Sequence, residues 1–164
     1  ADQVKETLFN MLAPEITQAQ VLDLFAGTGN VGIESLSRGA KHVVFVEKRP
    51  AHVRVITRNL AACGVKDRSR VYCGDANNVV CALHKAGWRF DLIFLDPPYR
   101  QTHLLQDMLS KIEALALCAE TGLVVIEHGH MFTPLEQVGR FILTKHRSIG
   151  DTCLTFYRPD SEKE

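Results

Sequence analysis

The sequence has no long apolar run and no paired-cysteine motif. No stretch approaches the roughly 20 consecutive apolar residues that a membrane-spanning helix needs, and the first residues do not resemble a signal peptide. The five cysteines are odd in number, scattered and never spaced as C-x-x-C, which argues against a disulfide framework and a structural zinc site. His128 and His130 form an H-x-H pair, but no third metal ligand is apparent. We therefore expect a cytoplasmic protein that holds no metal.

The chain also lacks net charge, since 19 basic residues balance 19 acidic ones. The balance is uneven along the chain: residues 38–70 contain nine basic side chains against two acidic ones, and the rest of the chain is acidic. A basic segment of this kind is typical of a phosphate-facing surface, and equally of a solvated helix face. Charge alone thus leaves a nucleic-acid partner open without requiring one.

Strand and helix patterns alternate along most of the chain. Apolar runs predict five strands, at residues 20–26, 42–47, 69–75, 90–96 and 122–128. The segments between them read as helices, with Pro50 as a start, Gly39 and Gly64 as stops, and a last helix over 103–118. This alternation predicts an α/β fold with a mostly parallel sheet, on which ligands bind at the carboxyl ends of the strands.

The two ends of the chain differ from this alternating pattern. Residues 1–18 read as a helix, and residues 138–158 alternate around the turn SIGDT, as an antiparallel hairpin does. Residues 159–164 read as a polar, frayed tail. We expect a single domain over residues 1–158, since no linker, repeat or low-complexity segment interrupts it.

A glycine-rich loop follows the first predicted strand. Gly27, Gly29 and Gly32 form G-x-G-x-x-G at the start of a helix, where the backbone can approach a ligand closely. Glu47 closes the second strand, where a carboxylate can accept hydrogen bonds from both hydroxyls of a ribose. NAD and S-adenosylmethionine both fit these two features.

Asp23 distinguishes between these two candidate cofactors. It lies in the first strand, four residues before Gly27, where a carboxylate would repel a pyrophosphate but would suit an ammonium group. S-adenosylmethionine carries that ammonium and no phosphate. Asp75 ends the third strand, where it can accept a hydrogen bond from an adenine amine. Each acid also has a structural interpretation, Asp23 as a buried helix-cap partner and Asp75 as a helix N-cap. Acids at three successive strand ends favour S-adenosylmethionine.

The stretch FDLIFLDPPY ends the fourth strand with Asp96, Pro97, Pro98 and Tyr99. The exocyclic amine of a base is a poor nucleophile because its lone pair is delocalised into the ring. A carboxylate and a backbone carbonyl that accept its N–H bonds favour the pyramidal geometry that frees this lone pair. The prolines fix φ at about −65° and hold the carbonyl, and the tyrosine offers a stacking face to an extruded base. A proline-rich turn that only closes a strand is the alternative.

These motifs resemble those of the RsmD family, bacterial enzymes that methylate the exocyclic amine (N2) of one guanine in 16S ribosomal RNA. The resemblance lies in LDLFAGTGNVGIESLSRGA, VEKRP, GDA and LDPPY, and it extends from QVKETLFNML to GDTCLTFY. It implies a Rossmann-like class I methyltransferase fold: a mostly parallel seven-stranded sheet with helices on both faces and an antiparallel C-terminal hairpin. It also implies 16S ribosomal RNA, or an assembling small ribosomal subunit, as the partner.

The resemblance implies roles for individual residues. The residues implied to bind S-adenosylmethionine are Asp23, Phe25, Gly27, Gly29, Glu47, Lys48, Asp75, Ala76 and Asp96. The catalytic residues that would hold and orient the guanine are Asp96, Pro97, Pro98 and Tyr99. The N-terminal helix, with Lys5 and Asn10, would lie over the cofactor, and the turn at 149–151 would border the base pocket. Family members usually carry arginine where this chain has Gln3.

Three other functions fit parts of the sequence. A DNA adenine or cytosine amine methyltransferase also uses D-P-P-Y, but it generally needs a sequence-reading domain, for which 164 residues leave little room. A non-catalytic S-adenosylmethionine-binding RNA module would be free to lose Asp96 or Tyr99. An NAD-dependent oxidoreductase is disfavoured by Asp23 and by the lack of an evident hydride-transfer acid or base.

Overall fold

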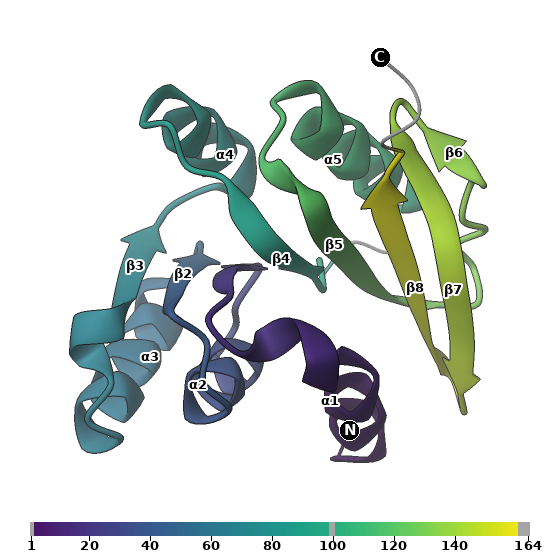
Figure 1. Cartoon of the computed structure of the whole chain (residues 1–164). Coiled ribbons are helices and arrows are strands. Elements are labelled where there is room, and N and C mark those ends of the chain that lie inside the picture. Colours follow the sequence, from purple (N-terminus) through teal and green to yellow (C-terminus); the bar gives the residue numbers. More distant parts are fainter. Residues whose placement is uncertain (1, 99–100, 161–164) are drawn as a thin grey trace.

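The computed structural model describes residues 2–98 and 101–160, so Tyr99 lies outside the described residues. A twisted sheet runs through the molecule, with helices on both of its faces (Figure 1). The helices are α1 (Asp2–Ile16), α2 (Asn30–Ser37), α3 (Pro50–Ala62), the 3-10 helix η1 (Lys66–Arg68), α4 (Ala76–Lys85) and α5 (Thr102–Ala114). The strands are β1 (Gln20–Leu24), β2 (His42–Glu47), β3 (Ser69–Cys73), β4 (Phe90–Leu95), β5 (Cys118–Gly129), β6 (Gln137–Val138), β7 (Phe141–Ile149) and β8 (Thr152–Pro159).

The strand order is β3-β2-β1-β4-β5-β8-β7-β6. Strands β1 to β5 pair with one another in parallel, and β8, β7 and β6 continue the sheet beyond β5 in antiparallel pairings. The order of the strands reverses between β1 and β4, because the chain builds outward from β1 to β3 and then returns to the other side of β1. This switch point brings the carboxyl ends of β1, β2 and β4 together, where doubly wound sheets bind ligands.

Each face of the sheet carries its own hydrophobic core. Val21 and Leu22 are neighbours on β1 and both are fully buried, but they belong to different cores. One core packs under α4 and α5, and the other packs under α1, α2 and α3, as the two layers in Figure 1 show. The central strands are apolar at nearly every position because both of their faces are covered.

The structure corrects several predicted boundaries. The sheet has eight strands among the described residues, not seven, because the two-residue β6 pairs with the start of β7. A strand this short leaves no alternating pattern in the sequence. The predicted helix over 103–118 ends at Ala114, where Ala116 takes a left-handed φ of 51°, and β5 begins at Cys118, earlier than the predicted 122. Similarly, β1 stops at Leu24 because Phe25 has a φ of 68°.

The predicted starts and stops of the early helices are confirmed. Pro50 is the first residue of α3, and the left-handed residues Gly39 and Gly64 follow the ends of α2 and α3. The predicted C-terminal hairpin is present as β7 and β8. Within the described residues, no helix combines the length and the apolar character needed to cross a membrane.

Candidate active site at the carboxyl ends of the strands

The glycine-rich loop connects β1 to α2, and its glycines serve different purposes. Gly27 has a φ of 59°, and a Cβ placed on it would meet nothing within 4 Å, so the loop leaves open space beside its backbone. Gly32, by contrast, lies in α2, where a Cβ would come within 2.3 Å of the Phe45 ring. The third glycine thus lets α2 pack closely on β2, and the first keeps the ligand side of the loop clear.

Asp23 is almost fully buried at the end of β1, with 2% of its surface exposed. Its Oδ2 accepts a hydrogen bond of 3.0 Å from the backbone N–H of Gly32, so it is the helix-cap partner that the structural interpretation predicted. Burial raises the pKa of Asp23 to about 7; the Gly32 hydrogen bond opposes this rise, and Asp96 and Glu47 add to it by charge repulsion. A cation beside this carboxyl would therefore be favoured, since it would compensate a buried charge.

Glu47 ends β2 and holds the glycine loop to it. Its Oε1 accepts from the Gly27 N–H at 2.9 Å, and its Oε2 accepts from the Arg49 N–H at 2.8 Å. The Nδ1 atom of His52 lies 3.6 Å from the same Oε2. The side chain is 9% exposed, so the carboxylate lies in a pocket of backbone donors next to the open space at Gly27.

Asp75 is the N-cap of α4, as the structural interpretation predicted. Its Oδ1 accepts a 2.9 Å hydrogen bond from the Asn77 N–H, and Ala76 behind it is buried. The Gly74 N–H donates to the backbone carbonyl of Glu47 at 3.0 Å, which keeps the ends of β2 and β3 side by side. The Lys48 side chain is exposed. An adenine-binding role for this strand end stays a prediction.

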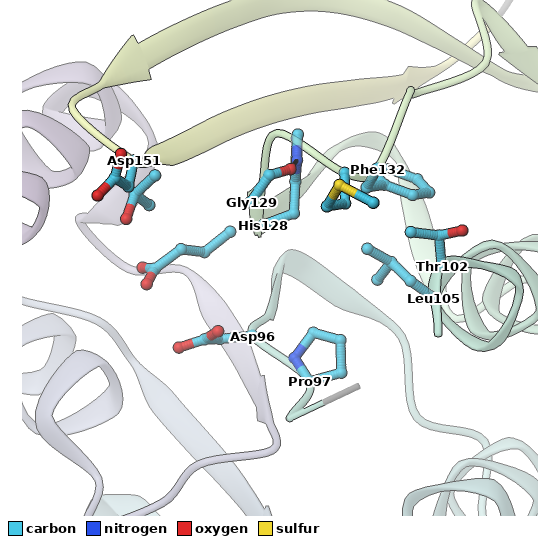
Figure 2. Close-up of a pocket in the computed structure, with 11 residues that line it drawn as sticks. Asp96, Pro97, Thr102, Leu105, His128, Gly129, Phe132 and Asp151 are labelled. Carbon is cyan, nitrogen blue, oxygen red and sulfur yellow. Dashed lines mark hydrogen bonds between the residues drawn. The ribbon is translucent and has the colours of Figure 1, made fainter. Parts of the chain in front are cut away.

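A cavity of about 530 Å³ opens at the ends of β4 and β5. Its lining residues are Asp96, Pro97, Thr102, Leu105, Glu127, His128, Gly129, Met131, Phe132, Asp151 and Thr152. In Figure 2, Asp96 and Pro97 lie on one side of the cavity and Phe132 lies on the other, and the Asp96 carboxyl points away from Phe132. Asp151 comes from the turn between β7 and β8 and lines this cavity, whereas Ile149 and Gly150 are not among its lining residues. That the turn borders a base pocket stays a prediction.

Glu127 is a site residue that the sequence analysis missed. It lies near the end of β5 and lines the cavity beside Asp96, and the two carboxyl groups interact by charge and as hydrogen-bond partners. Loss of hydration raises the pKa of Asp96 to about 6, although the residue is open to the cavity, and Glu127 stabilises its charged form. Loss of hydration and the charge of Asp96 raise the pKa of Glu127 to about 7. A search for every acid at a strand end would have found Glu127.

His128 holds the wall of the cavity through a buried chain of hydrogen bonds. Its Nδ1 lies 2.8 Å from the Gly129 carbonyl, its Nε2 lies 2.7 Å from Thr155 Oγ1, and His146 Nδ1 lies 2.9 Å from the same oxygen. Burial lowers the pKa of His128, which favours the neutral ring. A carbonyl only accepts, so Nδ1 of His128 donates to it; the Thr155 hydroxyl then donates to Nε2 and accepts from His146. This chain of hydrogen bonds links β5, β8 and β7 behind the cavity.

In the described part of the protein, no group of three or more metal-binding side chains is present.

The structure brings some of the predicted residues together and leaves others apart. Asp23, Glu47 and Asp96 are close enough for their charges to interact. Lys5 on α1 instead pairs with Glu34 on α2, at 3.4 Å, while Gln3 and Asn10 are exposed. The position of α1 over a cofactor stays a prediction.

The basic segment at residues 38–70 is partly used inside the fold. Arg68 donates to the Ala40 carbonyl at 2.7 Å, and Arg38 lies 3.1 Å from the Glu34 carboxylate. These two guanidinium groups already have partners in the protein. A phosphate-binding role is therefore a prediction for the other basic side chains of the segment.

Comparisons with known proteins agree with this architecture. A family model described as conserved hypothetical protein 95 matches residues 1–158. Ribosomal RNA small subunit methyltransferase D of Escherichia coli strain K12 is 36% identical over 164 residues, which cover 99% of this chain and 80% of that protein.

Solved structures share the fold. A conserved hypothetical protein of Streptococcus pyogenes superposes with a TM-score of 0.87 at 29% identity, over 98% of each chain. An RNA methyltransferase from Salinibacter ruber, in complex with S-adenosyl-L-homocysteine, superposes with a TM-score of 0.74 at 15% identity, over 98% of this chain and 94% of that one, and shows the fold alone. The fold is that of the class I methyltransferases. The resemblance read from the sequence motifs is confirmed, and the chain belongs to the family of ribosomal RNA small subunit methyltransferase D, the RsmD family.

Proposed function

We propose that the protein transfers a methyl group from S-adenosylmethionine to the exocyclic N2 amine of a guanine in 16S ribosomal RNA. The substrate is the RNA itself or an assembling small ribosomal subunit. Family membership and the names of the relatives support a methyltransferase acting on small-subunit ribosomal RNA. The observation that carries the proposal is the position of Asp96 at the end of β4, where it lines the cavity and lies close enough to the buried acid Asp23 for their charges to interact.

The residues at the ends of β1, β2 and β3 suit S-adenosylmethionine. Gly27 leaves open space beside two acids with little exposure, which would attract an ammonium group and ribose hydroxyls and repel a pyrophosphate. Asp23 would hold the ammonium group and Glu47 the ribose, and Asp75 with the Ala76 backbone would hold the adenine. When bound, this cofactor supplies an electrophilic methyl group on a sulfonium.

The chain's own groups would prepare the amine for transfer. Asp96 would accept a hydrogen bond from one N–H of the N2 amine, and a backbone carbonyl held by Pro97 and Pro98 would accept one from the other N–H. These two hydrogen bonds would free the nitrogen lone pair. N2 would take the methyl group from the sulfonium, which would leave as the thioether of S-adenosylhomocysteine, and N2 would then give up one proton. A carboxylate whose pKa is about 6 is suited to accept that proton near neutral pH.

The test uses the protein with labelled S-adenosylmethionine and three acceptors: unmodified 16S ribosomal RNA, small subunits that lack modifications, and double-stranded DNA. We expect N2-methylguanine at one position of the RNA, mapped by nuclease digestion and mass spectrometry. Methyl transfer to DNA would support the DNA amine methyltransferase instead. Tight binding of S-adenosylhomocysteine without transfer to any acceptor would support the non-catalytic module.

A further inference from the structure

Glu127 is a second acid beside Asp96, and the proposed function gives it no role. The β4–β5 register pairs Leu95 with Ile126, so the residues that follow them, Asp96 and Glu127, lie side by side at the strand ends. Both line the same cavity, and their carboxyl groups interact directly. Glu127 is only half-buried, so one side of its carboxyl remains open to a ligand.

The rest of the cavity is shaped for a flat, largely apolar group. Pro97, Leu105 and Phe132 contribute apolar surface to the cavity, and Leu105 and Phe132 lie across it from Asp96 (Figure 2). An extruded base fits such a site, with its ring between apolar side chains and its Watson–Crick edge toward the polar groups. That edge would face a pair of carboxyl groups.

The bases differ in what they offer to such a pair. Guanine presents two adjacent donors, N1–H and the N2 amine, and so can donate to two acceptors at once. Adenine and cytosine present an amine beside a ring nitrogen that only accepts. A second ionised carboxylate is attracted to the guanine edge and repelled by the ring lone pair of the other two bases.

We propose that Glu127 selects guanine by accepting a hydrogen bond from its N1–H while Asp96 accepts from the N2 amine. This inference rests on the proposed function, because it requires a guanine amine as the methyl acceptor. Asp96 acts on the reacting nitrogen, and Glu127 determines which base can place its amine there. The direct interaction between the Asp96 and Glu127 carboxyl groups would be replaced by their hydrogen bonds to the base when it enters between them.

2-Aminopurine provides the test, because it keeps the reactive amine of guanine but has a lone pair at N1 in place of the N–H. Once the methylated nucleotide is mapped, 16S ribosomal RNA is assembled by splinted ligation with guanine or 2-aminopurine at that position. The ratio of kcat/KM for the two RNAs is measured with the wild-type protein and with Glu127→Gln, at about pH 8.5, above the pKa values of both carboxyls. The intrinsic reactivity of 2-aminopurine is the same for both proteins, so it cancels in the comparison.

We expect the preference for guanine to fall by about 10–100-fold in Glu127→Gln, the discrimination that one well-placed hydrogen-bonding pair provides. The glutamine amide can donate to N1 of 2-aminopurine, which the ionised carboxylate cannot do. Glu136→Gln is the matched control, since Glu136 is exposed and does not line the cavity, and it should keep the wild-type ratio. An unchanged ratio in Glu127→Gln would overturn the inference.

If Glu127→Gln transfers no methyl to either RNA, the same ratio is measured as equilibrium affinity in the presence of S-adenosylhomocysteine. A fall in the guanine preference for binding supports the selection role, and an equal preference in both proteins refutes it. Failure of the wild-type protein to methylate the guanine RNA would count against the proposed function instead. The two failures are therefore distinguishable.

Discussion

The protonation of Asp23 should make cofactor binding depend on pH. Burial raises the pKa of this carboxyl to about 7, so it is largely neutral at pH 5 and ionised at pH 8. In the binding mode that we propose, only the ionised form would pair with the ammonium group of S-adenosylhomocysteine, so binding below pH 7 would release a proton. The affinity should therefore rise as the pH increases and level off above pH 7.

The size of this effect follows from the fraction of Asp23 that is ionised. Two pH units below the pKa, about one molecule in a hundred carries the carboxylate, so the affinity at pH 5 should be about 100-fold weaker than at pH 8. This difference corresponds to about 3 kcal/mol of binding free energy. Well below pH 7 the dissociation constant should change about tenfold for each pH unit, and this dependence should flatten as the pH passes through 7.

Isothermal titration calorimetry measures both the affinity for S-adenosylhomocysteine and the number of protons released on binding. Titrations at pH 6 in two buffers of different ionisation enthalpy should show release of about one proton for each S-adenosylhomocysteine bound. Asp23→Asn keeps an oxygen that can accept from the Gly32 N–H, so it should fold and bind weakly, with an affinity close to that of the wild type at pH 5 and little dependence on pH. 5′-Methylthioadenosine lacks the ammonium group and serves as the control ligand.

Two results would refute this reasoning. One is an S-adenosylhomocysteine affinity that stays constant from pH 5 to pH 8 while the protein remains folded. The other is an equal pH dependence for 5′-methylthioadenosine, which would assign the proton to a group other than the one that faces the ammonium.

The same carboxyl should lower the stability of the free protein at high pH. Its pKa in the folded state lies above the unfolded value of 3.8, so the folded state binds the proton more tightly, and stability falls as the pH rises from about 4 to 7. A rise of this size corresponds to at most about 4 kcal/mol. Urea unfolding should therefore show that Asp23→Asn stabilises the free protein more at pH 8 than at pH 5. An equal change at both values would contradict the assignment.

Three further predictions concern other parts of the site. Glu47→Ala should weaken S-adenosylhomocysteine binding by roughly 1–3 kcal/mol in calorimetry, because a charged acceptor is lost, whereas retained affinity would exclude the ribose role. Asp96→Asn should keep its melting temperature and cofactor affinity but slow single-turnover methyl transfer by about 10²–10⁴-fold; full activity would remove Asp96 from the mechanism. Gly32→Ala should lower the free energy of unfolding by about 1–3 kcal/mol through its clash with the Phe45 ring, and Phe45→Leu should restore part of that loss.

The order of the elements and most of the acids at the strand ends could be predicted from the amino-acid sequence. Strands that are buried on both faces appear as continuous apolar runs, and these are local patterns that need no knowledge of the partner strands. Asp23, Glu47 and Asp96 could be placed at one edge of the sheet because parallel strands all end there. The motifs around them were sufficient to identify the family.

Which side chains lie next to one another in the site depends on the folded chain. Glu127 lies 31 positions after Asp96, and the β4–β5 register alone makes them neighbours. Asp23 could be read from the sequence as a ligand-binding acid or a helix cap; the structure shows its hydrogen bond to α2 and a burial that makes its charge costly without a cation. The sequence offers no third metal ligand beside His128 and His130, and it gives His128 no other role. In the structure, the hydrogen bonds of His128 and His146 with Thr155 connect three strands. Burial and contacts between distant strands set the pKa values and hydrogen bonds of these groups, and no local pattern in the sequence records either property.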